Sequence, residues 1–213
     1  MYAVAIDGPA GSGKSTIAKL LAKELNISYV DTGAMYRAIA LKAKEENLDT
    51  EEKLKNELEN IKIDFQDNNI FLDEKDISDE IRTEEISKLS SKISKYPFVR
   101  EKLVLIQQDI AKKKPVVMEG RDIGTVVLKD ADYKFYLTAS IDSRAMRRYK
   151  QNLEKGIDIS LEDIKAEIIQ RDDNDKNREH SPLKQASDAI LIDNSDLSLR
   201  DNVDKMLSVI RGE

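Results

Sequence analysis

The apolar residues of the chain fall into two patterns, short continuous runs and stripes with helical spacing, which follow one another along the sequence. The runs predict buried strands, and the stripes predict amphipathic helices between them. Strands connected through helices pair in parallel, so the sequence predicts an α/β fold in which a parallel sheet is flanked by helices. We expect strands at residues 3–6, 27–30, 115–118, 133–137 and 189–193.

Residues 61–78 show a different pattern, because apolar and polar positions alternate there. Alternation is typical of strands that are buried on one face only. It predicts a small antiparallel ribbon inserted between helices, and insertions of this kind often lie over a ligand. The expected ribbon has strands at 61–65, 70–72 and 75–78 and a turn at 67–69.

Helical spacing predicts the rest of the chain. A polar helix is expected over residues 45–60, and another helix is expected to hold Pro97 in its first turn. Ser160 is a plausible cap for a helix that leads into the charged residues after Arg171. Nothing in this pattern distinguishes Arg100 from an ordinary surface residue of its helix.

The stretch 142–179 contains nearly equal numbers of basic and acidic residues, so it is not a basic patch. We interpret residues 144–180 as a mobile lid whose arginines pair with acids when it is open and bind phosphates when it closes. A solvated charged helix is the alternative. His180 is the only histidine and has no partner pattern around it, so we assign it no catalytic role.

Composition narrows the class of protein. A length of 213 residues suits one domain, 1–213, with an inserted lobe at 61–95. The net charge of −6 argues against a general nucleic-acid partner. The chain has no cysteine, its first residues lack the features of a signal peptide, and no apolar run is long enough for a membrane span. We expect a cytoplasmic monomer with no membrane partner.

Residues 8–15 match the phosphate-binding loop pattern G-x-x-x-x-G-K-[ST], between a predicted strand and a predicted helix. Glycines let successive N–H groups point inward and hold phosphate oxygens, helped by the helix dipole. Lys14 would reach the β- and γ-phosphates, and Ser15 would offer its hydroxyl to Mg²⁺. The alternative is a chance match in a glycine-containing turn. The residues expected to hold ATP are Gly8, Pro9, Ala10, Gly11, Ser12, Gly13, Lys14, Ser15 and Thr16.

Charged residues follow two of the other predicted strands. Arg37 lies one turn into a helix and could clamp a phosphate, although a solvated helical arginine is the alternative. Residues 119–124 place two acids and an arginine between glycines. Glu119 and Asp122 could hold Mg²⁺-bound waters or orient a nucleophile, and Arg121 could stabilise a transferring phosphate. A structural Arg–Asp pair in a tight loop is the alternative.

These features favour a kinase over other nucleotide-binding classes. A GTPase would need D-x-x-G after its second strand and N-K-x-D for guanine, and neither occurs in the chain. Arginines at 37, 121, 171 and 178 lie in segments expected to converge above the sheet. Several arginines facing a phosphate loop suit an acceptor that is itself a phosphate, since phosphoryl transfer needs mainly positioning and charge neutralisation.

Four segments resemble the bacterial cytidylate kinases, the (d)CMP kinases of the nucleoside monophosphate kinase group. They are residues 6–14, 31–37, 119–127 and 171–178, the last followed by Ser181-Pro182-Leu183, and the likeness runs essentially from end to end. The resemblance implies the P-loop NTPase fold, with an antiparallel NMP-binding insert and a helical lid. It also implies transfer of the γ-phosphate of ATP to CMP or dCMP in the presence of Mg²⁺.

The resemblance also implies a role for individual residues. Asp122 would accept a hydrogen bond from the exocyclic amine of cytosine, which uracil lacks, while Arg100 would donate to the base carbonyl and ring nitrogen. The register at Ser91 is open, because Ser90 is adjacent. The implied sets are Lys14, Arg121, Asp122 and Arg178 for catalysis; Arg148 for ATP; Arg37, Arg121 and Arg178 for the acceptor phosphate; Thr32, Ser91, Arg100 and Asp122 for cytosine; and Arg171 and Asp175 for the sugar.

Two other functions remain compatible with the sequence. One is a kinase of the same fold that uses another small acceptor, such as UMP or a metabolite hydroxyl. The other is a nucleotide-dependent binding protein or switch that turns over slowly.

Overall fold

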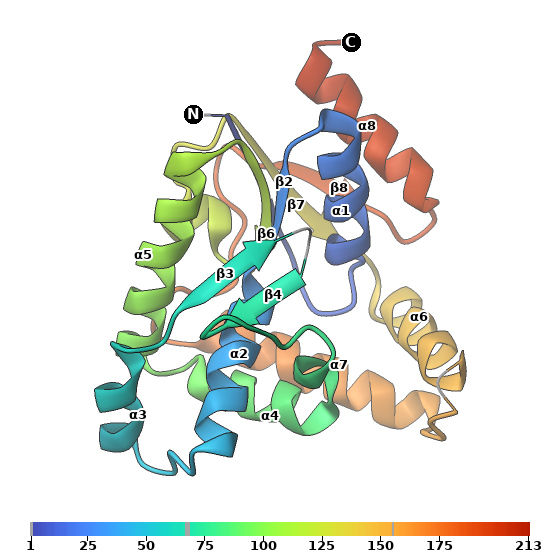
Figure 1. Cartoon of the computed structure of the whole chain (residues 1–213). Helices are drawn as coiled ribbons and strands as arrows, with labels where there is room; N and C mark the ends of the chain where they lie inside the picture. Colours follow the sequence, from blue (N-terminus) through green and yellow to red (C-terminus); the bar gives the residue numbers. More distant parts are fainter. Residues whose placement is uncertain (1, 67–68, 155) are drawn as a thin grey trace.

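A five-stranded parallel sheet forms the centre of the molecule, as the sequence predicts, with the strand order β2-β6-β1-β7-β8 (Figure 1). The computed structural model describes residues 2–66, 69–154 and 156–213. The first two residues of the turn expected at 67–69 therefore lie outside the described part. The sheet consists of β1 (Ala3–Asp7), β2 (Ser28–Asp31), β6 (Val116–Gly120), β7 (Tyr133–Thr138) and β8 (Ile190–Asp193).

Helices cover both faces of this sheet (Figure 1). Along β1, Ala3 and Ala5 belong to one core cluster, while Val4 and Ile6 belong to the other. A strand buried on both faces needs a continuous apolar run, which explains the pattern in the sequence. The helices are α1 (Lys14–Leu25), α2 (Thr32–Glu45), α3 (Glu51–Leu58), α4 (Glu84–Ile93), α5 (Pro97–Lys113), α6 (Ile141–Glu154), α7 (Leu161–Asn177) and α8 (Leu199–Arg211), with short turns η1 (Glu80–Arg82) and η2 (Ile123–Val127).

The two cores divide the helices. Side chains of α1 and α8 pack with Val4 and Ile6, whereas side chains of α2, α4 and α5 pack with Ala3 and Ala5 on the other face. Pro97 begins α5 in its first turn, as expected, because its missing N–H costs nothing there.

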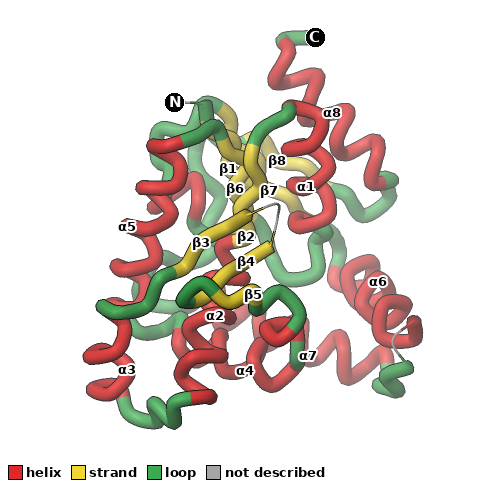
Figure 2. Tube along the Cα trace, in the orientation of Figure 1, coloured by secondary structure: helices red, strands yellow, loops and turns green. Residues whose placement is uncertain are grey.

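The predicted ribbon is confirmed as a three-stranded antiparallel sheet, ordered β3-β4-β5 (Figure 2). Ile63 and Phe65 are buried while the polar residues between and after them are exposed. The buried side joins the core that α2 and α5 form. The ribbon is made of β3 (Ile63–Gln66), β4 (Asn69–Leu72) and β5 (Lys75–Asp76).

The polar helix expected over residues 45–60 is wrong as one continuous element. The chain leaves α2 after Glu45 and passes through Asn47, whose φ of 52° is left-handed. A new helix, α3, then begins after Thr50, whose side chain accepts the N–H of Lys53. Polar composition did not reveal this break, since it contains neither glycine nor proline.

Helices α6 and α7 pack against each other beside the sheet (Figure 2). Ala145, Ile164 and Ile168 form a small core of their own between the two helices. The predicted cap of α7 is confirmed, because Ser160 Oγ accepts the N–H of Asp163. Among the described residues, no helix combines the length and the apolar character that crossing a membrane requires.

Candidate active site

A cavity of about 720 Å³ lies where β1, β2 and β6 end and α1, α2 and η2 follow. In parallel α/β sheets, the carboxyl ends of the strands are where ligands bind. The structure brings most of the predicted site residues to this one cavity. Those that line it are Ala10, Gly11, Gly13, Lys14, Ser15, Thr16, Thr32, Arg37, Ser91, Arg100, Arg121, Asp122, Arg148, Arg171, Asp175 and Arg178.

Gly8, Pro9 and Ser12 are not among the lining residues, and they shape the phosphate loop instead. A Cβ on Gly8 would lie 2.0 Å from the carbonyl oxygen of Leu137, and the φ of Gly8 is +153°. The Pro9 carbonyl oxygen accepts hydrogen bonds from Ser12 Oγ at 3.0 Å and from Lys14 Nζ at 2.8 Å. These bonds close the loop between β1 and α1, so the strand-loop-helix prediction is confirmed.

The cavity carries an excess of positive charge. Burial and the nearby Arg121 lower the pKa of Lys14 to about 7, against the opposing influence of Glu119. Although part of Arg171 is exposed, its partial desolvation among the surrounding groups and the charge of Arg121 likewise lower its pKa to about 10. Such shifts mean that the protonated forms lack enough negative partners. A polyanion would supply those partners.

Glu119, at the end of β6, connects the phosphate loop to the neighbouring strand. Its Oε1 accepts hydrogen bonds from Ser15 Oγ at 2.5 Å and from the Tyr29 hydroxyl at 3.1 Å. Burial, reinforced by Asp31, raises the pKa of Glu119. The backbone carbonyl oxygen of Glu119 accepts a hydrogen bond from Thr32 Oγ1 at 2.8 Å, which places Thr32 at the same strand end.

Arg100 is buried, so its interpretation as a surface residue is wrong. It is 4% exposed, and its Nη2 lies 2.5 Å from Asp122 Oδ2. Its guanidinium also lies over the ring of Tyr36, 5.4 Å from the centroid. Arg100 Nε is buried and has no hydrogen-bond partner among the described residues. A buried N–H without a partner is costly, which points to a ligand atom.

Ser90 and Ser91 both line the cavity. Ser90 is buried, and its Oγ donates to the Ser87 carbonyl at 2.9 Å. Ser91 is half-buried. The assignment of Ser91, and not Ser90, to the cytosine base therefore stays a prediction.

Arg121 and Asp122 do not pair with each other, so the alternative of a local Arg–Asp pair is wrong. Arg121 Nε donates instead to Asp175 Oδ2 at 2.8 Å. Although burial alone would raise the pKa of Asp175, Arg121 and then Arg178 lower it below its ordinary value. Arg178 Nη2 is buried and has no partner among the described residues. Arg178 Nη1, however, lies 3.6 Å from Asp175 Oδ1, so the carboxylate of Asp175 holds both Arg121 and Arg178 at the cavity.

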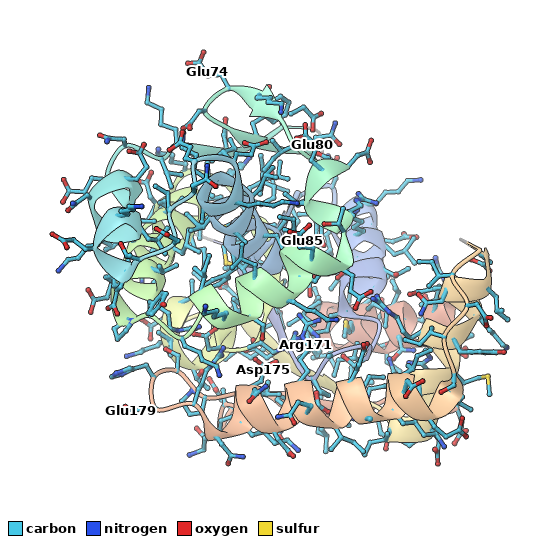
Figure 3. The ribbon with its side chains drawn as sticks, turned by 90° about the horizontal axis from the view of Figure 1, so that it is seen from below. Glu74, Glu80, Glu85, Arg171, Asp175 and Glu179 are labelled. Atoms are coloured by element: carbon cyan, nitrogen blue, oxygen red, sulfur yellow. The ribbon has the colours of Figure 1, made fainter. Side chains whose placement is uncertain are left out.

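The remaining arginines reach the cavity from α2, α6 and α7. Arg37 is half-buried and pairs with Asp31 at 2.9 Å, so it is not a freely solvated arginine. Arg148 is exposed at the rim. Figure 3 shows Arg171 and Asp175 on the side of α7 toward α4. Arg144 pairs with Asp172, as the interleaved charges suggested; that the lid moves stays a prediction.

Sequence reasoning missed two buried residues that support the site. Asp7 accepts the N–H groups of Ile123 and Gly124, both at 2.8 Å, and burial raises its pKa to about 6. A carboxylate that ends a continuous apolar strand was the available signal. Asn194 donates from Nδ2 to the Ser12 carbonyl at 2.8 Å. No local pattern marks Asn194, since only the sheet order brings the end of β8 to the loop.

Among the described residues, no group of three or more His, Asp or Glu side chains is placed to hold a metal ion alone. Ser15 and Glu119 do offer two oxygen atoms 2.5 Å apart at the phosphate loop. Mg²⁺ prefers oxygen ligands, and it usually takes only one or two from the protein beside water and substrate phosphates. The two residues therefore fit Mg²⁺ that arrives with a nucleotide.

Solved structures of known proteins support the fold. The chain is similar to an uncharacterized protein from Eubacterium ventriosum (TM-score 0.58, 14% identity, 100% of both chains covered). It is also similar to a shikimate kinase from Bacteroides thetaiotaomicron (TM-score 0.53, 13% identity, 99% of this chain and 98% of that one). At these identities the likeness concerns the fold alone.

Sequence relatives are much more similar. A cytidylate kinase of Thermosipho melanesiensis is 49% identical over 98% of this chain and 96% of its own length. One from Clostridium botulinum is 51% identical over 98% and 97%. The family model described as cytidylate kinase matches residues 4–212. The chain therefore belongs to the cytidylate kinase family.

Proposed function

We propose that this protein transfers the γ-phosphate of ATP to CMP or dCMP and so produces CDP or dCDP. The observation that carries the proposal is a single cavity that holds both a phosphate loop and the buried pair of Arg100 and Asp122. The first suits a triphosphate, and the second suits a base with one amine and one carbonyl. Membership of the cytidylate kinase family supports the same reaction.

We assign the ATP side to the phosphate loop. Residues 8–16 would hold the triphosphate, those that line the cavity by contact and the others by shaping the loop, with Lys14 beside the β- and γ-phosphates and Arg148 at the rim. Ser15 and Glu119 would hold Mg²⁺ and its waters. The ion would neutralise charge on the phosphate oxygens as transfer proceeds.

We assign the acceptor side to the opposite wall. Arg37, Arg121 and Arg178 would bind the phosphate of CMP, and the buried Nη2 of Arg178, which no described residue pairs with, supports this assignment. Arg171 and Asp175 would bind the sugar. The residues assigned to cytosine are Thr32, Ser91, Arg100 and Asp122.

Asp122 would discriminate between cytosine and uracil. Its carboxylate accepts from an exocyclic amine, whereas the carbonyl that uracil has there would face a negative charge. The same residue would hold the acceptor in line with the γ-phosphate, which is its contribution to catalysis. Lys14, Arg121 and Arg178 would stabilise the charge that develops on the transferring group.

The insert at 61–95 and the lid at 144–180 would close over the two nucleotides. Closure would exclude water, which otherwise competes with CMP for the phosphoryl group. The lid assignment is supported by the arginines that α6 and α7 bring to the cavity.

A coupled assay of ADP production with CMP, dCMP, UMP, AMP and GMP in turn tests the proposal. We expect CMP and dCMP to stimulate ATP consumption most. The proposal fails if no monophosphate stimulates consumption, which is the result for a slow switch. It also fails in its base assignment if UMP is used faster than CMP.

A further inference from the structure

A buried ion pair joins α6 to α7 directly against the phosphate loop. Arg144 Nη1 lies 2.6 Å from Asp172 Oδ2, and the two side chains are 5% and 7% exposed. Neither residue belongs to the nucleotide contacts proposed above. An ion pair buried this deeply needs further hydrogen bonds to be tolerated, and the bonds that this pair makes are informative.

Both members of the pair bind the same residue of the loop. Asp172 Oδ1 accepts the N–H of Ala10 at 3.2 Å, and Arg144 Nη1 donates to the Ala10 carbonyl at 2.9 Å. Arg144 Nε also donates to the Ala139 carbonyl at 3.0 Å, just before α6. The backbone of Ala10 is thus held on both sides by side chains from the two lid helices.

A second connection ties α6 to the same loop. Arg147, one turn after Arg144, donates to Asn194 Oδ1 at 3.0 Å and to the Asn194 carbonyl at 2.6 Å. Asn194 Nδ2 in turn donates to the Ser12 carbonyl. The start of α6 is therefore bonded to the loop near both Ala10 and Ser12, so a shift of this end of α6 would break these bonds or move the loop with it.

The position of Asp172 also sets the position of its neighbours on α7. Arg171 precedes it, and Asp175, which holds Arg121, lies about one turn later (Figure 3). Because a helix is rigid over one turn, the contact between Asp172 and Ala10 fixes the depth at which Arg171 and Asp175 lie over the phosphate loop.

We propose that Arg144 and Asp172 are positioning residues, which act through Ala10 to place Arg171 and Asp175 of α7 against the phosphate loop. The inference rests on the proposed function, because it concerns the step of phosphoryl transfer. The pair sets the distance between the phosphate loop, which would bind ATP, and the side of α7 that carries Arg171 and Asp175. It therefore affects kcat more than the equilibrium binding of ATP, which the loop N–H groups and Lys14 maintain.

The chain offers a matched control. Lys165 Nζ and Asp142 Oδ1 lie 2.7 Å apart and join the same two helices, but this pair lies at the surface, with side chains 36% and 81% exposed. This second pair does not line the cavity. The comparison separates joining α6 to α7 from joining both helices to the loop.

The test compares Asp172→Asn and Arg144→Lys with Asp142→Asn. Asp172→Asn keeps the shape but removes the charge, and Arg144→Lys keeps the charge but loses the fork that reaches Ala10 and Asp172 together. For each variant, kcat with CMP, the equilibrium Kd for ATP and the unfolding temperature are measured. Hydrogen exchange of the backbone at residues 8–14 supplies a readout besides activity.

We expect kcat to fall about 10- to 100-fold in Asp172→Asn and Arg144→Lys, the size of effect that a small misplacement produces. The Kd for ATP is expected to stay within about threefold, and exchange at residues 8–14 to accelerate. Asp142→Asn is expected to match the wild type in kcat within about twofold, since exposed pairs contribute little.

Several results would overturn the inference. One is a kcat in Asp172→Asn and Arg144→Lys that equals the kcat of Asp142→Asn. Another is a loss of ATP affinity as large as the loss of kcat. A third is failure of both Asp172→Asn and Arg144→Lys to fold, which would make the pair purely structural. Wild-type transfer to CMP in the same assay separates the two proposals. If the wild type does not phosphorylate CMP, the proposed function fails. If the wild type phosphorylates CMP and both variants do so with the wild-type kcat, only the positioning role fails.

Discussion

The guanidinium of Arg100 and the carboxylate of Asp122 meet at 2.5 Å in the interior, although Arg100 lies near the start of α5 and Asp122 follows the end of β6, 22 residues later. Removing one partner of a buried pair leaves the other charge uncompensated, so such pairs resist change. This pair also lines the cavity, where each residue retains the capacity to bind a base.

Asp122→Asn should narrow the preference for CMP over UMP. An amide can present either its oxygen or its NH₂ group to a base edge, so the variant no longer rejects the uracil carbonyl. We expect kcat/KM for CMP to fall by about 10- to 100-fold while kcat/KM for UMP changes much less. Steady-state kinetics with both nucleotides measures the ratio, and an unchanged ratio would remove Asp122 from base recognition.

Lys14→Ala should lower kcat by about 100-fold or more, because the developing charge on the γ-phosphate loses its cation. Lys19→Ala is the matched control, since Lys19 lies on the same helix but over the ring of Tyr29. Near-normal activity in Lys14→Ala would contradict the assignment of the loop. Single-turnover transfer from labelled ATP separates the chemical step from product release.

Binding of ATP should take up a proton near neutral pH. The pKa of Lys14 is lowered to about 7, mainly by burial, so a fraction of the side chain is neutral in the free protein above that pH. A bound triphosphate favours the charged form and raises this pKa. Calorimetry at pH 8 in buffers of different ionisation enthalpy measures the uptake. Lys14→Met should abolish most of it, and identical uptake in the variant would contradict the prediction.

Glu119→Gln should raise the Mg²⁺ concentration needed for half-maximal activity by about tenfold, because groups that orient metal ligands have effects of this size. The control is Tyr29→Phe, which removes the other donor to Glu119 Oε1 and leaves Ser15 in place. Activity is measured against free Mg²⁺ at saturating nucleotide. Equal Mg²⁺ requirements in the two variants would show that Glu119 has no part in metal binding.

Asp7 should make stability depend on pH below neutrality. Burial raises its pKa from 3.8 to about 6, so between these values the folded state holds a proton that the unfolded state has released. Its contribution to the free energy of unfolding is therefore fully present below pH 4 and decreases as the pH rises through 6. Urea unfolding at pH 4, 5 and 7 should show a difference between wild type and Asp7→Asn that changes by on the order of 2 kcal/mol. A constant difference would contradict the shift.

The strand-loop-helix around Lys14 could be predicted because all its signals are local. An apolar run, glycines and a helical stripe follow one another within about twenty residues. The burial of Arg100 could not be predicted in this way. Its neighbours in the sequence are those of an ordinary amphipathic helix, and only the packing of α5 against η2, which directly follows Asp122, brings it to that carboxylate.

The same distinction explains the other differences. The sequence correctly predicts that Arg121 and Asp122 follow the end of a strand. Their partners, Asp175 on α7 and Arg100 on α5, come from tertiary contacts that the sequence does not reveal. The break at Asn47 was missed because a left-handed asparagine leaves no compositional mark. Residue types and strand ends are thus visible in the sequence, whereas pairings across the cavity are not.

The crowding of arginines around Lys14 has a practical consequence for the purified protein. Any small polyanion that enters the cavity relieves the repulsion between these cations, and a ligand that binds only the folded state raises the apparent stability. Melting temperatures recorded in phosphate or sulfate solutions will therefore exceed those in buffers that lack these multivalent anions. The resting enzyme has to be characterised in solutions free of such salts, or its ligand-free stability will be overstated.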